Sequence, residues 1–558
     1  MGSIPTGSAP APAAKPVPQV SDRAEFWVLD TLNNTYRRAA ATLQLITPEL
    51  YMWVEDGFHV RMEDLEASGR YFAEITRPTL HRYFGQGLQP STANDARLHV
   101  FNGSVPNAGG YFYSQDQYPT SVVPRSNERN LFFVNLHTVS PGTDGYNALL
   151  AHEFQHMIQW HNDTDEETWV NEGLSELAVR LSGLPVYNHI VYLRSPDIAL
   201  THWPPRTANA GPHYGGNYLL MEYLLGRFGE DFVRDLAQEP ANGIVGVEKA
   251  LERRGEEFLP LFRDWTVANL LDNLGNDRYG YREITVPAPD LGNTLTVPAE
   301  ISDTVQPFGV DYVSVSVTGT VRVEFTGQTT IPIAPFASVQ GDYFWWSNRG
   351  DNKNTTLTRE VDLTSVSEAT LLGSFWFSLE EGYDFAHVSI STDGGGTWQI
   401  LEGLHTQPAP PDSTAIGPGY TGNSGDAAEP LWIEEAYSLS GFAGRKVLLR
   451  METVTDDAIN LDGLWIRSLE IPEIGWRDNG ESLDGWNAQG FVRVENSLPQ
   501  QYLVTAVLHG PTPEVVPIAI GPDGRGGASL HAPDGLTLVV SAVTGHTSQP
   551  AQYKLRVE

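Results

Sequence analysis

A five-residue motif in the first third of the chain, His152-Glu153-Phe154-Gln155-His156, constrains this sequence more than any other feature. Apolar residues recur around it at helical spacing, so we predict a helix from Tyr146 to Trp160. The two histidines are one turn apart on one face of that helix. Two imidazoles placed in this way can bind one metal ion, and Zn²⁺ is the usual ion for His-Glu-x-x-His. Glu153 is the candidate general base, because it can take a proton from water that the metal activates.

A catalytic zinc ion needs a third protein ligand and an open fourth position. A second helix is predicted from Glu167 to Leu181, and it places Glu172 sixteen residues after His156. Glu172 is therefore the candidate third ligand. Glu176 is one turn further along the same face, where a carboxylate can accept a hydrogen bond from a ligand histidine. An acidic helix face that binds no metal is the alternative.

Together, the motif and the stretch Trp169-Val170-Asn171-Glu172-Gly173-Leu174-Ser175-Glu176 resemble the gluzincin metallopeptidases. The resemblance covers about residues 22–285 and implies a zincin-like mixed catalytic domain. It also implies a role for each candidate: His152, His156 and Glu172 bind zinc, Glu153 is the base, and Glu176 orients a histidine.

Two related families fit less well. The metzincin pattern needs Gly and His three and six residues after the second histidine, where this chain has Gln159 and Asn162. The Gly-x-Met-Glu-Asn pattern of the aminopeptidase branch is absent from the sequence, which favours an endopeptidase.

The stretch Gly211-Pro212-His213-Tyr214-Gly215-Gly216-Asn217-Tyr218 precedes a predicted apolar helix, Leu219 to Phe228. Gluzincins carry a Tyr or His on a downstream element that stabilises the oxyanion. The resemblance therefore makes Tyr214 and His213 the candidates for this role, followed by Tyr218. Aromatic packing at a helix start remains the alternative for each of them.

Two further stretches of the catalytic region each leave two interpretations open. Tyr111 to Ser114 is interpreted either as an edge strand that pairs with extended substrate or as an ordinary hairpin with aromatic packing. The acidic loop Asn162 to Glu167 is interpreted either as a calcium site or as a solvated helix start.

Composition limits the classes of function. Lys and Arg number 35 against 69 Asp and Glu, and the resulting net charge of −34 argues against nucleic-acid binding. The chain has no cysteine, which excludes disulfides and thiol chemistry. No apolar run reaches the roughly 18 residues of a membrane span. We expect a secreted, extracellular protein. Residues 1–21 are a Pro/Ala-rich tether without the apolar core of a signal peptide, so we expect that the leader is not part of this chain.

At 558 residues the chain is too long for one core, and its composition changes after residue 285. Alternating apolar residues predict strands there in place of helices. We predict that residues 286–334 and 473–558 complete one β-sandwich, and that residues 335–472 form a second, jelly-roll-like sandwich inserted in it. The fold class is thus multidomain α+β and all-β.

The predicted insert resembles the β-sandwich that follows the protease in the immune inhibitor A family. The residues that carry this resemblance are Trp345-Trp346-Ser347-Asn348-Arg349-Gly350-Asp351-Asn352, Glu380-Glu381-Gly382-Tyr383-Asp384, Ser391-Thr392-Asp393-Gly394-Gly395 and Asp462-Gly463-Leu464-Trp465-Ile466. That family continues its zinc motif as Gly-Leu-Pro-Asp-Glu-Tyr, whereas this chain continues as Met157-Ile158-Gln159-Trp160. The resemblance therefore holds for the insert, and the protease half is closer to other gluzincins.

Two features of the insert concern ligands. Asp351, Asp384 and Asp462 are candidate ligands of a structural Ca²⁺, against the alternative of solvated loops. The stretch Ser391 to Trp398 matches the Asp-box of sialidases, but it occurs once, and we therefore interpret it as a hairpin turn.

The sequence thus predicts a secreted zinc endopeptidase that acts on proteins or peptides, with two accessory β modules that bind cell-surface glycan or protein. The alternative is a non-catalytic adhesion or binding protein with a vestigial zinc site. A sialidase-like glycosidase is a third option, which rests on the single Asp-box alone.

Overall fold

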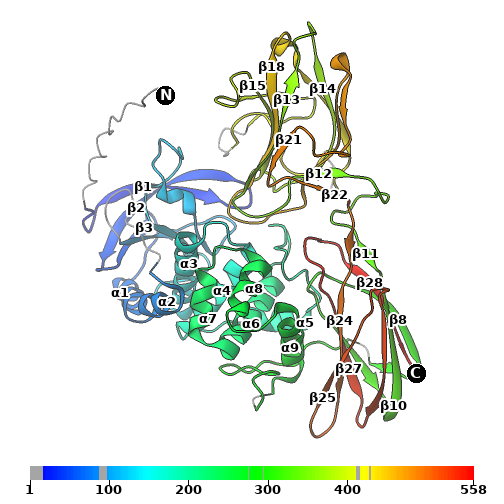
Figure 1. Cartoon of the computed structure of the whole chain (residues 1–558). Coiled ribbons are helices and arrows are strands. Elements are labelled where there is room, and N and C mark those ends of the chain that lie inside the picture. Colours follow the sequence, from blue (N-terminus) through cyan, green and yellow to red (C-terminus); the bar gives the residue numbers. More distant parts are fainter. Residues whose placement is uncertain (1–16, 87–96, 274, 293, 410–414, 426–428) are drawn as a thin grey trace. The chain divides into compact units, whose positions relative to one another are not determined.

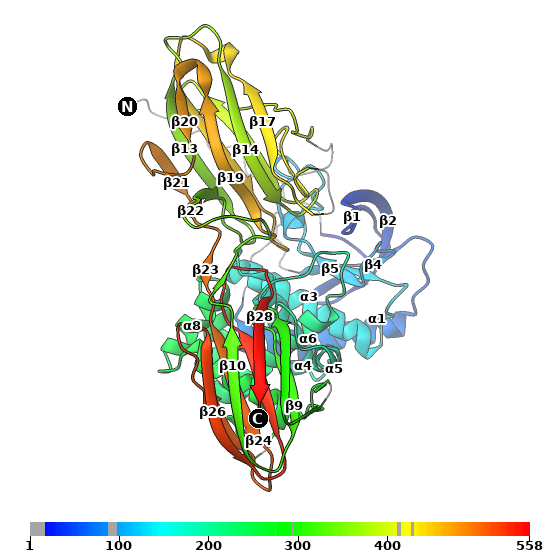
Figure 2. The same cartoon turned by 90° about the vertical axis from the view of Figure 1, so that its right-hand side faces the viewer.

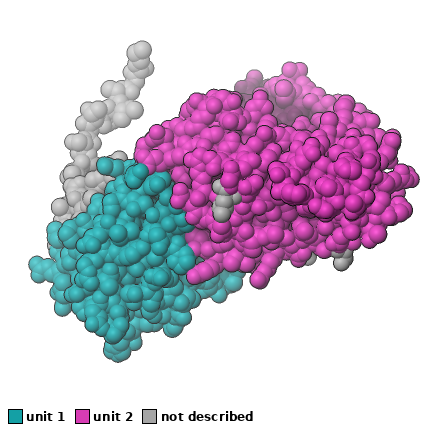
Figure 3. All heavy atoms as spheres, turned by 90° about the horizontal axis from the view of Figure 1, so that it is seen from below, with its two compact units in different colours: residues 1–162, 178–185 teal, residues 163–177, 186–558 magenta. Residues whose placement is uncertain are grey.

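The computed structural model describes residues 17–86, 97–273, 275–292, 294–409, 415–425 and 429–558 (Figure 1). Compact packing divides the chain into two units, which Figure 3 colours separately. Unit 1 holds residues up to 162 and 178–185, and unit 2 holds 163–177 and 186–558. No helix in these described ranges is both long and apolar enough to cross a membrane. The tether predicted over residues 1–21 lies outside the described residues as far as residue 16.

Unit 1 is built on a six-stranded sheet with the order β1-β2-β3-β4-β6-β5. Its strands are β1 (Arg23–Asp30), β2 (Thr35–Ile46), β3 (Leu50–Glu55), β4 (Leu98–Gly103), β5 (Gly110–Phe112) and β6 (Leu131–Asn135). Strands β3, β4 and β6 are parallel, and the remaining pairs are antiparallel. The parallel strands are almost wholly buried, as their continuous apolar runs predict.

Helices pack against this sheet. They are α1 (Met62–Tyr71), a single wider turn at Phe72–Thr76, α2 (Arg77–Phe84) and α3 (Asp144–Asn162). The predicted helix from Tyr146 to Trp160 is confirmed by α3. Phe154 of α3 packs against Phe72, with ring centroids 5.1 Å apart, and against Phe132 of β6, at 6.4 Å. These contacts fix the face that α3 turns to the core.

Helices also form the first part of unit 2. They are α4 (Thr168–Leu181, of which residues 178–181 belong to unit 1), α5 (Asn188–Arg194), α6 (Gly211–Phe228), α7 (Glu230–Ala237), α8 (Gly243–Glu252) and α9 (Phe258–Leu271). The predicted helix from Glu167 to Leu181 is confirmed by α4 to within one residue.

The prediction that the next apolar helix begins at Leu219 is wrong, since α6 begins at Gly211. Pro212 suits the first turn of a helix, because it has no N–H to leave unpaired. Gly215 weakens a helix as an isolated residue, but a Cβ there would lie 2.1 Å from the Asn188 carbonyl oxygen of α5. The close packing of α5 on α6 therefore requires this glycine, and it outweighs the low helix propensity of the sequence.

Two sheets of unit 2 combine strands from both ends of its β-rich part, so that green and red strands lie side by side in Figure 2. One sheet has the order β26-β10-β28-β8 and the other β25-β24-β27-β9-β7. Their strands are β7 (Leu295–Thr296), β8 (Ala299–Val305), β9 (Asp311–Ser316), β10 (Gly319–Gly327), β24 (Tyr502–Leu508), β25 (Glu514–Ile518), β26 (Arg525–Ala532), β27 (Leu536–Ala542) and β28 (Ala551–Val557). One hydrophobic core joins both sheets.

Two further sheets lie between these strands in the sequence. One has the order β17-β14-β19-β12-β22 with β20 beside β19, and the other β16-β15-β18-β13-β21. Their strands are β12 (Phe344–Trp346), β13 (Asn354–Asp362), β14 (Thr370–Ser378), β15 (Phe385–Ser391), β16 (Gln399–Ile400), β17 (Ile433–Ser438), β18 (Lys446–Val454), β19 (Gly463–Ile471), β20 (Trp476–Asp478), β21 (Trp486–Gln489) and β22 (Val492–Val494). Two short strands form a separate pair: β11 (Thr330–Ile331), which comes after β10 in the sequence, pairs with β23 (Leu498–Pro499), which comes after β22. The described chain thus combines helices with several β-sheets, as the predicted multidomain α+β and all-β class requires.

The predicted end of the insert at residue 472 is too early. Strand β21 pairs with β13 and β22 pairs with β12, so residues 476–494 extend the sheets of the preceding region. These strands have three or four residues each, which is too short for an alternating pattern to show in the sequence.

The interpretation of the single Asp-box as a hairpin turn is confirmed. Ser391 Oγ donates to Asp393 Oδ1 at 2.8 Å, and that oxygen also accepts from the Thr397 backbone N–H at 2.9 Å. The turn joins β15 to β16, which pair antiparallel. The motif therefore closes a local turn.

Candidate metal centre

The two histidines of α3 face one another. Their Nε2 atoms are 3.0 Å apart, and the rings stand nearly perpendicular, with an interplanar angle of 82°. Both side chains are partly exposed. A tetrahedral zinc ion with bonds of 2.0–2.1 Å holds its ligand atoms about 3.3 Å apart. The spacing of His152 and His156 is therefore close to what one such ion requires.

Glu153 lies beside this pair, with only 4% of its surface exposed. Its Oε2 accepts a hydrogen bond of 2.7 Å from the backbone N–H of Phe112 in β5. The strand can come this close because Gly110 has no side chain: a Cβ there would lie 2.7 Å from Leu149 of α3. This partner of Glu153 was missed in the sequence, because a backbone N–H carries no residue-type signal.

Strand β5 is the last strand of its sheet. Tyr111 stacks on Phe133 of β6, with centroids 4.4 Å apart, and its hydroxyl accepts from the Leu29 N–H at 2.8 Å. The Tyr111 side chain thus serves packing, as one sequence interpretation held. The strand position at the sheet edge also meets the geometric requirement of the other interpretation, substrate pairing.

Glu172 on α4 completes a group of possible ligands. His152, His156 and Glu172 each offer one ligand atom, and these three atoms lie within 4.8 Å of one another. Two imidazoles and one carboxylate match the donor set of a catalytic zinc site with an open fourth position. The chemistry of the three side chains therefore fits this ion. Glu176 follows one turn later on α4 and is partly exposed like Glu172.

The three candidates for the oxyanion lie within the first eight residues of α6. Tyr214 is partly exposed and packs edge-on against Trp203, with centroids 4.8 Å apart. His213 is buried beside the same indole, at 5.9 Å, and burial lowers its pKa to about 4. Tyr218 is buried near His189. Partial exposure and a hydroxyl that can donate favour Tyr214, while His213 is neutral at pH 7.

Tyr214→Phe should lower kcat by about 10²- to 10³-fold, the usual effect of losing one oxyanion donor. Zinc content should be unchanged, because the substitution removes one hydroxyl and no ligand. Tyr218→Phe is the matched control on the same helix, and it should have little effect. Steady-state hydrolysis of a peptide substrate with metal analysis would measure both, and unchanged turnover in Tyr214→Phe would remove it from the site.

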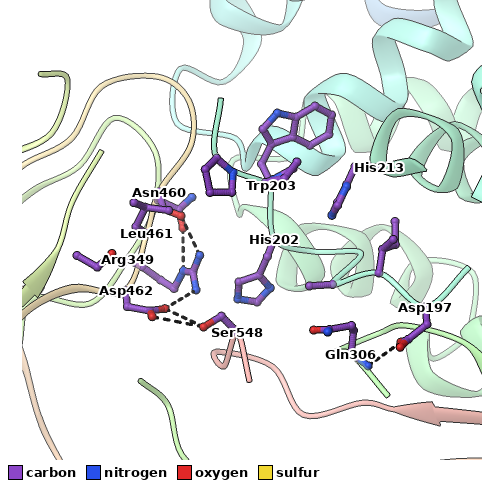
Figure 4. A pocket seen from close by; sticks show the side chains of 15 residues that line it. Asp197, His202, Trp203, His213, Gln306, Arg349, Asn460, Leu461, Asp462 and Ser548 are labelled. Carbon is purple, nitrogen blue, oxygen red and sulfur yellow. Dashed lines mark hydrogen bonds and ion pairs between the residues drawn. The ribbon is translucent and has the colours of Figure 1, made fainter. Parts of the chain in front are cut away.

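His213 also lines a cavity of about 410 Å³ within unit 2 (Figure 4). His202 and Trp203 lie on one side of this cavity, and Arg349 and Asp462 lie on the other. The pKa of His202 is held well below its usual range, first by burial and then by the positive charge of Arg349. The wall near His213 is therefore built of neutral imidazoles and an indole.

The acids of the loop Asn162 to Glu167 have protein partners. Asp165 forms an ion pair with Lys353, and Glu166 is buried, where its Oε1 accepts from the Gly243 N–H at 2.8 Å. Glu167 Oε2 accepts from the Trp169 indole N–H at 2.8 Å. These contacts give Asp165, Glu166 and Glu167 partners within the protein, while one buried oxygen each of Asp163 and Glu166 has no hydrogen-bond partner in the described part of the chain. Calcium here stays an untested prediction.

The structure does not bring Asp351, Asp384 and Asp462 into one ligand group. Asp351 bonds to Thr168 and Asn460, and Asp462 pairs with Arg349. The acidic group that forms in the described chain is instead Glu380, Asp384 and Asp456, whose oxygens lie within 4.8 Å of one another. Asp384 was identified in the sequence. Glu380 stands four residues before it in the same quoted stretch, but Asp456 is distant in sequence and was missed.

This acidic group makes stability depend on pH. Burial raises the pKa of Glu380 to about 7, and burial followed by the charge of Glu380 raises the pKa of Asp384 and Asp456 well above the usual range. Unfolded Asp and Glu titrate near pH 4, so the folded state binds more protons between about pH 4 and at least pH 7. The stabilisation is complete below that window and is lost as the pH rises through it.

We therefore expect the melting temperature, measured with a chelator present, to fall as the pH rises from about 5 to about 7.5. Asp384→Asn should flatten this dependence, and Asp393→Asn in the Asp-box turn is the control that should not. Added Ca²⁺ should restore the melting temperature at about pH 7.5 in the original protein only, if this group binds it. A melting temperature that changes neither with pH nor with added calcium would contradict the prediction.

A comparison with known families finds a match for part of unit 2. A family model described as "Immune inhibitor A-like, MAM domain" matches residues 310–496, about a third of the chain. The matched range includes strands β12 to β22. This match agrees with the resemblance to the immune inhibitor A β-sandwich that the sequence motifs indicated.

Two curated proteins are similar to part of the chain. "Pre-pro-metalloprotease PrtV" of Vibrio cholerae serotype O1 is 28% identical over 157 residues, which are 28% of this chain and 16% of that protein. "Immune inhibitor A" of Bacillus thuringiensis subsp. alesti is 29% identical over 181 residues, which are 31% of this chain and 24% of that protein. The chain matches at most about a quarter of the length of these relatives. One of them is named a metalloprotease.

Proposed function

We propose that this protein is a secreted zinc endopeptidase. The observation that carries the proposal is the convergence of His152, His156 and Glu172, whose ligand atoms lie within 4.8 Å of one another, with Glu153 beside the two histidines. The name of the PrtV relative supports a metal-dependent protease. The expected substrates are proteins or peptides.

In this proposal His152, His156 and Glu172 would hold Zn²⁺, and the ion would supply a Lewis acid that lowers the pKa of a water molecule and polarises the substrate carbonyl. Glu153 would take a proton from the attacking water with one carboxylate oxygen and later deliver it to the leaving amine. The Phe112 N–H keeps the other oxygen in place. Glu176 orients a ligand histidine, and Tyr214 or His213 donates to the oxyanion.

The same geometry supports a role for β5 in binding substrate. The Phe112 N–H bonds to Glu153, so the strand passes directly over the general base. An extended peptide added at the outer edge of β5 would present a backbone carbonyl near this carboxylate. Main-chain pairing of this kind favours an unfolded or flexible substrate over a folded one.

The domain arrangement is also part of the proposal. A catalytic domain at 22–285 is followed by one β-sandwich from residues near 286–334 and the C-terminal end, with the second sandwich inserted. Pairing of β9 with β27 and of β10 with β26 and β28 supports this nesting. Calcium in the inserted sandwich and binding of cell-surface glycan or protein by the β modules remain proposals of the same rank.

The test combines metal analysis with an activity assay. We expect about one zinc per chain, hydrolysis of casein, loss of both after dialysis against a chelator, and recovery of both when zinc is returned. Zinc bound without hydrolysis of any unfolded protein would favour the alternative, an adhesion or binding protein with a vestigial site. A native protein without zinc would contradict the proposed centre itself.

A further inference from the structure

The helix that carries Glu172 has its N-terminus bonded to the inserted β-sandwich. The first residue of α4, Thr168, donates its backbone N–H and its hydroxyl to one oxygen of Asp351, at 3.0 and 2.6 Å. Asp351 comes from the loop between β12 and β13, 183 residues later in the sequence. Only 1% of the Asp351 surface is exposed, and Thr168 is buried as well. The contact is therefore dry and has fixed geometry.

This contact is of the kind that stabilises a helix start. The first N–H groups of a helix have no partner within the helix, and a carboxylate near them also meets the positive end of the helix dipole. The residue before Thr168 is Glu167, whose own carboxylate accepts from Trp169 Nε1. Asp351 thus supplies from a distant segment the capping oxygen that Ser, Thr or Asp at the helix start would usually supply.

Several contacts within the sandwich hold Asp351 in place. Its second oxygen accepts from the Asn460 side chain at 2.7 Å. Asn460 is in turn fixed by Arg349, whose Nε and Nη2 donate to its side-chain and backbone oxygens at 2.8 and 2.9 Å (Figure 4). Arg349 also pairs with Asp462. The amide of Asn460 is therefore oriented as a donor toward Asp351, and the carboxylate has little freedom to rotate.

The neighbouring loop adds a strained residue to this contact. The Ile459 N–H donates to the Thr168 hydroxyl at 3.3 Å. Ile459 has a φ of +64°, a conformation that a β-branched side chain rarely adopts. Such strain persists only where the surrounding structure determines the backbone, and it is concentrated at sites with a function.

A second tie joins the sandwich to the segment that leads into α6. Arg206 Nε donates to Glu380 Oε1 at 2.5 Å, and its guanidinium lies 4.4 Å from the centre of the Tyr383 ring. The inserted sandwich therefore contacts both elements that carry proposed site residues in unit 2, α4 with Glu172 and the segment before Tyr214.

We propose that Asp351 is a positioning residue of the metal centre: by holding the first turn of α4, the inserted β-sandwich sets the place of Glu172. Glu172 is four residues after Thr168, about 6 Å along the helix axis, so a loose first turn displaces it directly. This inference rests on the proposed zinc site, and it makes the sandwich a working part of the enzyme instead of an appended binding module.

The experiment compares Asp351→Ala, Asp351→Asn and Lys353→Met in the full chain. Lys353→Met is the matched control, since it removes the ion pair with Asp165 in the same contact region and leaves Thr168 untouched. Zinc affinity is measured by competition with a chromophoric chelator. We expect Asp351→Ala to weaken it about tenfold, the lower limit for an outer partner of a metal ligand. Asp351→Asn keeps an acceptor for Thr168, so its zinc affinity should lie between those of the original protein and Asp351→Ala.

Two further readouts separate positioning from general damage. In Asp351→Ala, kcat on a peptide substrate should fall while KM stays within about twofold, because the residue contacts no substrate. Hydrogen exchange of the α4 amides should quicken in its first turn, while the strands of the sandwich stay protected. Lys353→Met should change none of these quantities.

Each outcome decides the inference. If the original protein binds zinc and Asp351→Ala binds it equally well, the inference is wrong and the proposed function stands. If the original protein binds no zinc, the proposed function is wrong. In that case the role of Asp351 at the metal centre fails with it, and hydrogen exchange of α4 tests only whether Asp351 holds the helix: faster exchange in Asp351→Ala alone would support that contact, and unchanged exchange would reject it. Equal losses of zinc affinity in Asp351→Ala and Lys353→Met would also overturn the inference. The general contact of the sandwich with this region would then matter, and the hydrogen bonds from Thr168 to Asp351 would not.

Discussion

Glu153→Gln should lower kcat for peptide hydrolysis by about 10²- to 10⁴-fold, the range that one general acid–base group contributes. Gln is the informative substitution because its amide oxygen can still accept from the Phe112 N–H, which Glu153 binds at 2.7 Å. The shape and packing of the site then stay the same, and only the ability to take a proton is lost. Glu153→Ala would leave that partly buried N–H without this partner, so the loss of the base and the loss of the hydrogen bond would be measured together.

The measurement pairs kcat with metal analysis. Zinc per chain should be the same in Glu153→Gln and in the original protein, since Glu153 is not in the ligand group. Glu360→Gln, an exposed carboxylate of β13, is the control for loss of one negative charge and should leave kcat unchanged. Retained activity in Glu153→Gln would mean that another group takes the proton, and the mechanism would have to be reassigned.

The sequence predicted well the parts of the fold that depend on local pattern. The helix with the zinc motif and the helix with Glu172 show their apolar spacing plainly, and α3 and α4 follow it. Strands β3, β4 and β6 are short, almost wholly buried apolar runs, so their local pattern also agrees with their place in the fold. In these elements the local preference and the tertiary environment agree, which is why the pattern was sufficient.

Elements whose conformation depends on a partner were not predictable. Strand β26, Arg525-Gly526-Gly527-Ala528-Ser529-Leu530-His531-Ala532, has low β propensity, and it becomes a strand because β10 pairs with it over eight residues. Helix α6 begins at Gly211 because α5 packs closely on its glycines. Both outcomes are set by neighbours that are far away in the sequence.

The same division applies to the candidate site. His152, Glu153 and His156 were visible as a motif, because their roles need particular residue types at fixed spacing. The Phe112 N–H and the Asp351 cap were not visible, because one is a backbone group and the other acts across 183 residues. Contacts of this second kind would decide whether the three proposed ligands form a working centre.

Glu172→Ala should weaken zinc binding by more than about 100-fold, beyond the 10- to 100-fold that an outer partner usually costs. Glu176→Ala should stay inside that range. The two residues form a matched pair, since they lie one turn apart on α4 with similar exposure, and each substitution has the same effect on helix propensity. Any difference in zinc affinity therefore reports on the role of the carboxylate.

Chelator competition on both variants, with far-UV circular dichroism to check the helix, measures this difference. Glu172 belongs to the group whose ligand atoms lie within 4.8 Å, and Glu176 does not, so the order of the two losses is fixed in advance. The reverse order would exchange their roles and place the third ligand one turn further along α4. Equal, small losses in both would mean that the two histidines find their third ligand on another element, and the resemblance to gluzincins would then end at the motif on α3.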